Sequence, residues 1–452
     1  MMKKSLFKNN LKSIHKTRRR FISILVMAFL GVGFFAGLVA TSPDMLDSLD
    51  KYADSSNLYD INIISTLGLT DDDITALQAL AGVENAYGIQ TKDSISKIDD
   101  KENICKVIEY NENVNTPVIV AGRNIENENE CLIDPAVVRT GKGVEEYIGK
   151  KIILENDDLD SNGNSIFTQK EFEIVGIAET PAYISSERGN TSIGNGTVSF
   201  YIFTKDVINM DYYTGVYITA KGAKETVTNS DEYLSIIDSV TSEIEAIKET
   251  RENARYQSLV DKITAQFDNI PEQMLNQDLI NTEISKIEKC KWYIQDRLDN
   301  SGYNNIFDAI KTMSNISKMF PVIFYIVAVL ISLTSMTRMI EEERIEIGTL
   351  KALGYTNVQI ISKYIIYSLL ACIIGGTLGM VVGLYLLPNI VWALYSMIYT
   401  IPKFYCSFRF DIGLLGIIIS FICIGGATVL VAINELKQMP SVLMRPKPPK
   451  KR

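Results

Sequence analysis

Histidine is almost absent from this sequence, since His15 is the only one among 452 residues. It lies in a basic N-terminal segment, so it cannot build a histidine metal site or a catalytic dyad with distant residues. No Gly-x-Ser-x-Gly nucleophile motif occurs either. The glycine-containing stretch 143–151 has the wrong spacing for a phosphate loop and lacks its Ser or Thr. We therefore expect no catalytic residue, no metal centre and no bound ATP in this chain.

Cysteines are few and dispersed, with six in the whole chain. Only Cys105, Cys131 and Cys290 fall in the long polar middle region. Three widely separated cysteines do not form a disulfide framework or a metal cluster. Whether Cys105 and Cys131 pair with each other stays open.

Charged residues are missing from four stretches, 21–43, 319–337, 364–402 and 412–434. A bilayer core of about 30 Å needs about 20 apolar residues, so three of these stretches fit one crossing each. In the third stretch, Pro388 and Asn389 are expected to end the span at 387, leaving 390–402 interfacial or extracellular. We predict an α-helical membrane protein with four transmembrane helices at 21–43, 319–337, 364–387 and 412–434. The first is expected to be a retained anchor, because its apolar run is longer than that of a signal peptide.

Lysine and arginine placement predicts the orientation of these spans. Segment 1–20 carries eight basic residues, connection 338–363 four, tail 435–452 six, but loop 388–411 only two. Basic residues favour the cytoplasmic side. We expect a multi-pass plasma-membrane protein with both termini and 338–363 in the cytoplasm, and 44–318 and 388–411 outside. The absence of ionisable residues inside the spans argues against proton or sodium relay.

The outer region 44–318 is strongly acidic, with 25 basic and 48 acidic residues and a net charge of −23. Such a charge disfavours nucleic acid as a partner. Alternating strand patterns predict an extracellular α+β domain over 44–229, in one or two subdomains. The strands are expected at 60–65, 107–110, 118–121, 151–154, 171–178, 198–203 and 215–219, with another starting at Val83 after a helix from Thr70 to Leu80.

From 230 to 318 the apolar residues recur at helical spacing, which predicts a helical extracellular extension, with a coiled coil as one form of it. Helical stretches are expected through 256–267 and 279–292, with 300–302 interrupting the pattern.

One loop resembles the first half of a calcium-binding loop, with Asp158, Asp160 and Asn162 at alternate positions. The twelfth position is Gln169 instead of Glu, and the flanks look like strands. We therefore favour a solvated hairpin tip and keep these residues only as a weak calcium candidate.

Glycines take the place of polar groups inside the spans. Gly33 and Gly37 are four apart, and Gly375, Gly379 and Gly383 form a row on one helix face. Small residues at this spacing let helices approach closely. Packing within one chain and a dimerising or sliding interface both fit this pattern.

The most informative segment is the connection between the second and third spans, which we call the coupling segment (338–363). Glu341 and Arg344 are three apart and can pair on a helix. Gly354 suits the left-handed position that ends a helix, and Thr356 with Gln359 forms a capping box for the next one. A charged hairpin is one interpretation, and a lever that a soluble partner pushes is the other.

The stretch 334–355 resembles the signature of the FtsX-like (MacB-like) permease family of ABC transporters, and 434–436 and 440–446 resemble the family's ending. Residues 292–303, with Phe320 and Pro321, resemble its Gram-positive branch. The resemblance implies that a separate cytoplasmic ABC ATPase, which binds ATP and Mg²⁺, docks on the coupling segment. The coupling residues that it implies are Arg338, Glu341, Glu342, Glu343, Arg344, Glu346, Gly348, Lys351, Gly354 and Tyr355.

The resemblance also implies a dimeric permease that transmits ATP-driven movement to its outer domain, termed mechanotransmission, and passes no substrate through a pore. Larger members of the branch carry a longer coiled coil and a second permease half. This chain is expected to be a half-size member that pairs with a copy or a partner permease, or a truncated one.

We expect the outer domain to act on a peptide, a lipid-linked substrate or lipoprotein, or a cell-wall enzyme. The alternative is a non-transporting signalling or scaffold subunit that regulates an extracellular cell-wall hydrolase. A passive adhesion or receptor protein is a third interpretation.

Overall fold

The computed structural model describes residues 17–138, 143–155, 159, 163–267, 277–401 and 403–439. The chain divides into two compact units. The first, which we call the helical unit, comprises Met1–Asp47, Asp308–Tyr395 and Phe404–Arg452. The second, the sheet unit, comprises Ser48–Phe307 and Ser396–Lys403.

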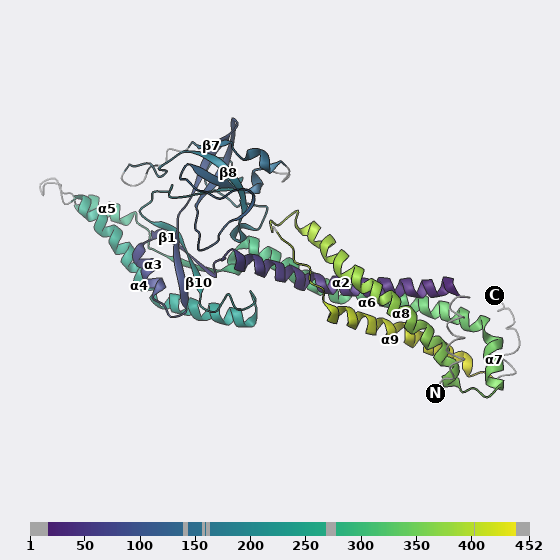
Figure 1. The fold of residues 1–452 in the computed structure, drawn as a ribbon. Coiled ribbons are helices and arrows are strands. Elements are labelled where there is room, and N and C mark those ends of the chain that lie inside the picture. Colours follow the sequence, from purple (N-terminus) through teal and green to yellow (C-terminus); the bar gives the residue numbers. More distant parts are fainter. Residues whose placement is uncertain are drawn as a thin grey trace. The chain divides into compact units, whose positions relative to one another are not determined.

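Long helices dominate the helical unit, where they run side by side (Figure 1). Within the described residues, four helices are long and apolar enough to cross a membrane, α2 (Arg18–Ser55), α6 (Ser301–Glu342), α8 (Asn357–Tyr395) and α9 (Phe410–Leu436). This confirms the predicted fold class of four membrane helices. Each helix is longer than its predicted span, because the absence of charge marks only the part of a helix suited to lipid. Two of these helices also extend into the sheet unit, α2 at its C-terminal end and α6 at its N-terminal end.

Helix α8 continues through Pro388 to Tyr395, beyond the predicted end of the third span at Leu387. Proline lacks the N–H that would bond the carbonyl four residues earlier, here that of Leu384. In the structure the thiol of Cys406 donates to that carbonyl, with 3.2 Å between sulfur and oxygen. A residue beyond the helix therefore replaces the missing partner, and the loop before α9 is shorter than predicted.

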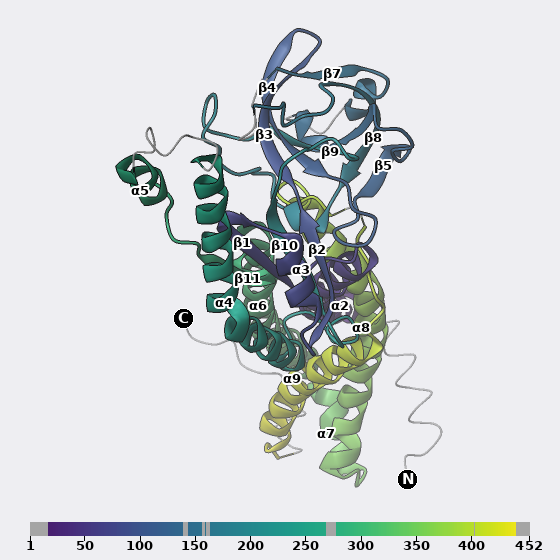
Figure 2. The same ribbon diagram turned by 90° about the vertical axis from the view of Figure 1, so that its left-hand side faces the viewer.

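One sheet of the sheet unit has four strands in the order β11-β1-β10-β2, all antiparallel. Their bounds are Trp292–Asp296, Ile61–Leu69, Tyr213–Ala220 and Val83–Ile89. Helix α4 (Asp231–Phe267) lies along this sheet and buries Tyr233, Ile237, Val240 and Ile244 in the shared core (Figure 2). Short helices α3 (Asp71–Gln78) and α5 (Gln277–Ser285) contact β2 and α4 respectively.

The other sheet has seven strands in the order β5-β8-β6-β9-β4-β3-β7, and β7 also pairs with β8, so the sheet closes on itself. Its strands are β3 (Thr91–Ile98), β4 (Lys101–Glu109), β5 (Val118–Gly122), β6 (Glu130–Ile133), β7 (Lys151–Leu154), β8 (Glu171–Glu179) and β9 (Phe200–Thr204). Cys105 and Cys131 lie buried in its core, and both thiols are free. Both sheets lie within the one compact sheet unit.

All seven predicted strands are present, as are the strand from Val83 and the helix after Thr70, whose backbone and hydroxyl both donate to Asp73 at 2.8 and 2.9 Å. The helix predicted through Trp292, however, is wrong, and so is the boundary at 229/230. Strand β11 pairs with β1, so residues beyond 230 complete the first sheet. Trp292 is 2% exposed and Tyr293 is 53% exposed, an alternation too short to stand out in the sequence.

Candidate functional site

The coupling segment forms a short helix between two long ones. After α6 ends at Glu342, α7 runs from Arg344 to Ala352. Gly354 then takes a left-handed φ of 87°, as the sequence predicted. The cap of α8 is also present, because the Thr356 N–H donates to Gln359 Oε1 at 3.1 Å and the Gln359 N–H donates back to Thr356 Oγ1 at 3.4 Å.

Charged side chains of α7 form hydrogen bonds with residues at the C-terminal end of α9. Lys351 Nζ donates to the backbone carbonyls of Leu436 (2.7 Å) and Gln438 (3.0 Å), at the end of α9. The buried Arg344 guanidinium also donates to the Gln438 side chain. These bonds place α7 under the C-terminal end of α9.

The residues beside the break between α6 and α7 are fastened to α8 and α2. Glu343 accepts from the Tyr364 hydroxyl at 2.7 Å and pairs with Lys363 at 3.0 Å. Lys363 also pairs with Glu346 at 3.2 Å, and Glu342 pairs with Arg20 of α2. The coupling segment is therefore bonded to α2, α8 and α9 and is not an isolated hairpin.

The coupling segment also exposes apolar and acidic side chains to its surroundings. Ile345, Leu353 and Val358 are 59%, 70% and 76% exposed. Glu341 and Glu342 are also exposed. We call these five residues the docking face. Of the other predicted coupling residues, Arg338 is exposed on α6, Gly348 is buried in α7, and Tyr355 packs half-buried against the helical core.

The glycine row lies between α2 and α8 of the same chain. A Cβ on Gly375, Gly379 or Gly383 would collide with the carbonyl oxygens of Leu25, Phe29 and Gly33 respectively. A Cβ on Gly37 would collide with the Gly383 carbonyl oxygen, and one on Gly33 would lie 3.1 Å from that of Gly379. The two backbones are therefore in contact, and the row packs within the chain.

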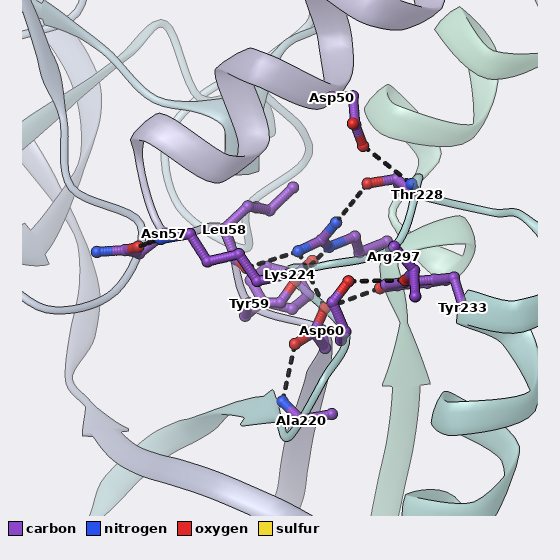
Figure 3. A network of polar contacts seen from close by, with 12 residues as sticks. Asp50, Asn57, Leu58, Tyr59, Asp60, Ala220, Lys224, Thr228, Tyr233 and Arg297 are labelled. Atoms are coloured by element: carbon purple, nitrogen blue, oxygen red, sulfur yellow. Dashed lines mark hydrogen bonds and ion pairs between the residues drawn. The ribbon is translucent and has the colours of Figure 1, made fainter.

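A buried arginine connects α2 and α6 inside the sheet unit (Figure 3). Arg297, four residues before α6, donates to the carbonyls of Leu58 (2.9 Å) and Tyr59 (2.8 Å), just after α2. It also donates to the Thr228 hydroxyl at 2.9 Å and pairs with Asp60 at 3.0 Å.

Asp60 and Thr228 extend this network to neighbouring elements. Asp60 accepts from the Tyr233 hydroxyl of α4 (2.9 Å) and from the Ala220 N–H of β10 (2.8 Å). The Thr228 N–H donates to Asp50 of α2 at 2.9 Å. Arg297 lies within the stretch 292–303 that resembles the Gram-positive branch, but sequence reasoning missed its role because its partners are far away in the chain.

A second buried cluster surrounds Glu179, at the end of β8. Arg188 makes a two-pronged ion pair with Asp134, both residues being buried. Glu179 Oε2 and the hydroxyl of Tyr52 are buried nearby without hydrogen-bond partners among the described residues. Burial, and to a lesser extent the Asp134 carboxylate, raise the pKa of Glu179 to about 7, although the Arg188 guanidinium opposes the shift.

The calcium candidate Asp158, Asp160 and Asn162 lies outside the described residues. Within the described residues, no group of three His, Cys, Asp or Glu side chains is arranged to hold a metal ion.

Residues 318–436 match the family model described as FtsX-like permease C-terminal. The match begins just before the predicted second span, includes the coupling segment and ends with α9. No curated protein sequence matches the chain.

Among solved structures, the chain is similar to the periplasmic region of MacB from Actinobacillus actinomycetemcomitans, at 9% identity over 56% of this chain and 92% of that one, with a TM-score of 0.27. It is also similar to the extracellular domain of the noncanonic ABC-type transporter YknZ from Gram-positive bacteria, at 10% identity over 40% and 94%, with a TM-score of 0.24.

Replacing Gly383 by Ala should lower the melting temperature of the detergent-purified chain, because the new methyl group must separate α2 from α8. Overpacking of this kind costs about 1–3 kcal/mol. Gly426→Ala in α9 is the matched control, since a Cβ there meets nothing within 4 Å. Equal melting temperatures for both variants would contradict the close contact.

Removing the buried guanidinium by Arg297→Ala should destabilise the chain by about 3–5 kcal/mol, because Asp60 would stay buried without its partner. Denaturant unfolding followed by circular dichroism measures this. The control is Lys224→Ala, which removes one exposed bond of 2.7 Å to Asn57 and should change stability little. A loss of stability below about 1 kcal/mol for Arg297→Ala would show that this network does not hold the end of α2 and the start of α6 together.

The raised pKa of Glu179 makes stability depend on pH with a defined sign. The protonated carboxyl suits the folded state, so this contribution is fully present below the ordinary pKa of 4.5 and is lost as pH rises towards 7. Glu179→Gln should abolish that component and make the chain about 3 kcal/mol more stable than the wild type at pH 8. Melting curves of both proteins from pH 5 to 8 test this, and a difference independent of pH would refute it.

Proposed function

We propose that this chain, which carries an FtsX-like permease C-terminal domain over residues 318–436, is the permease subunit of an ABC transporter whose ATPase is a separate protein. The observation that carries the proposal is the coupling segment, which is bonded to α2, α8 and α9 and also exposes the apolar and acidic side chains of the docking face. Exposed apolar residues among charged ones are the composition of a surface that binds another protein. The ATPase would supply the site for ATP and Mg²⁺, and the permease would have no catalytic role.

Movement imposed on α7 would reach every spanning helix. Its bonds to Leu436 engage α9, those of Glu343 engage Tyr364 and Lys363 of α8, and Glu342 engages Arg20 of α2. Because the α2–α8 contact is made by backbone, these two helices resist sliding apart. Such a bundle is suited to move as a body, which supports mechanotransmission over passage through a pore.

The sheet unit is the proposed receiver of this movement. Helices α2 and α6 are unbroken from one unit into the other, so a displacement of either helix would be carried along its own length into the sheet unit. The basic residues near the span ends support a cytoplasmic coupling segment and an outer sheet unit. We propose that the acidic sheet unit acts on a peptide or lipid-linked substrate in a permease dimer, with a second copy or a partner permease.

Leu353→Asp should weaken ATPase binding about tenfold, because it replaces an apolar side chain of the docking face that is 70% exposed by a charged one. The tagged chain is purified from its native membrane, and the co-purifying ATPase is quantified by mass spectrometry and by ATP hydrolysis. Charge reversal of Glu341 should act in the same direction.

The control is Tyr293→Asp, an equally polar change at an exposed residue of the sheet unit. Absence of any ATPase from the wild-type preparation would refute the proposed function. Undiminished ATPase recovery with Leu353→Asp would refute only the docking face.

A further inference from the structure

Three segments of the chain connect the spanning helices to the sheet unit, and all three meet at one place within that unit. They are the turn after α2 at Asn57–Tyr59, the start of α6 at 300–303, and the loop 396–403 between α8 and α9. Hydrogen bonds connect these segments to one another through Asn300 and the short stretch 182–186. We call this meeting place the joint.

Asn300 lies at the centre of the joint. Its side-chain oxygen accepts from the N–H groups of Gly302 (3.1 Å) and Tyr303 (3.3 Å), and so caps α6. Its side-chain nitrogen donates to the carbonyl of Ala182 at 2.8 Å and to the hydroxyl of Tyr59 at 3.2 Å. One amide therefore connects α6, the segment after α2 and the stretch 182–186.

The loop between α8 and α9 is attached to the same stretch by backbone pairing. The Thr400 N–H donates to the Ile184 carbonyl at 2.8 Å, and the Ser186 N–H donates to the Ile398 carbonyl at 3.0 Å. Ser185 and Tyr399 form the bridge between these bonds. Gly302 completes the joint, since a Cβ there would lie 3.3 Å from the Ser185 nitrogen.

A cavity of 790 Å³ lies beside these contacts, and its walls include Ser185, Arg188, Asn300 and Asn305. Stretch 182–190 is therefore not packed on all sides. The few bonds of Asn300 and the close approach at Gly302 hold it against α6.

We propose that Asn300 is a positioning residue that makes the start of α6 and the α8–α9 loop move together, as one rigid joint. The inference rests on the proposed function, because it names where the movement of separate helices is combined before it reaches the sheets. It requires that the joint stay closed throughout the ATPase cycle.

The first test separates the two roles of the side chain. Asn300→Asp keeps an oxygen that caps Gly302 and Tyr303 but removes the donor to Ala182 and Tyr59. We expect the melting temperature to change little and stimulation of the co-purified ATPase by the permease to fall about fivefold, a typical coupling between sites. The control is Asn305→Asp, the same chemical change on the same cavity wall, where the side chain makes no hydrogen bond within the described part of the chain.

The second test reads the joint without ATPase activity. Bridge partners such as Ser185 and Tyr399 lie within the Cα separation that a disulfide spans. The double variant Ser185→Cys, Tyr399→Cys is oxidised in native membranes. We expect a disulfide to form efficiently when residue 300 is Asn, and at least about threefold more slowly when Asn300→Asp is added. The single-cysteine variants are controls for the native thiols.

The cross-linked protein also decides whether the joint is rigid. We expect ATPase stimulation to survive cross-linking within about twofold. Loss of stimulation on oxidation, restored by a reductant, would overturn the proposal, as would equal cross-linking rates with Asn and Asp at 300. If the wild-type chain does not stimulate the ATPase, the proposed function is refuted. The cross-linking rates with Asn and Asp at position 300 then still test whether Asn300 holds the joint together.

Discussion

Burying a guanidinium is costly unless its charge is paired and its donors are bonded, and in the sheet unit this constraint fixes how the chain is arranged. Arg297 satisfies it with two carbonyls after α2, one hydroxyl before α4 and the carboxylate that begins β1. None of these partners can shift without leaving a buried charge incompletely bonded, which is costly. The ends of two long helices, one sheet and α4 are thus held in one register by a single side chain.

The helical unit follows the same logic with weaker bonds. The charges of the coupling segment are partly exposed, and they fasten α7 to α9, α8 and α2 in several places instead of one. Bonds of this kind contribute little individually, and solvent and salt weaken them. Such an arrangement suits a segment that holds its neighbours together while a partner moves it, whereas the Arg297 network suits a part that must not open.

The sequence predicted what depends on local pattern. Four charge-free stretches gave the helices, alternating residues gave most strands, and Gly354 and Thr356 gave the ends around the coupling segment. What it did not predict depends on partners far away in the chain. Pro388 suggests a helix end in the sequence, but in the structure Cys406 supplies the donor that proline lacks. Trp292 fits a helical pattern in the sequence, but in the structure it belongs to a strand that pairs with β1. Arg297 is one of 45 basic residues until its buried partners are known. The glycines were recognised as a contact surface, but only the structure shows that α2 occupies it.

The backbone contact between α2 and α8 constrains how these two helices can respond to a change in the surrounding bilayer. Helices separated by large side chains can tilt independently when the surrounding bilayer becomes thinner or thicker. Here, three glycines of α8, spaced four residues apart, lie directly against backbone carbonyl groups of α2. Hydrophobic mismatch must then be met by a tilt shared by the pair, or by deformation of the lipid around it. Membrane thickness thereby becomes a variable that acts on both helices at once.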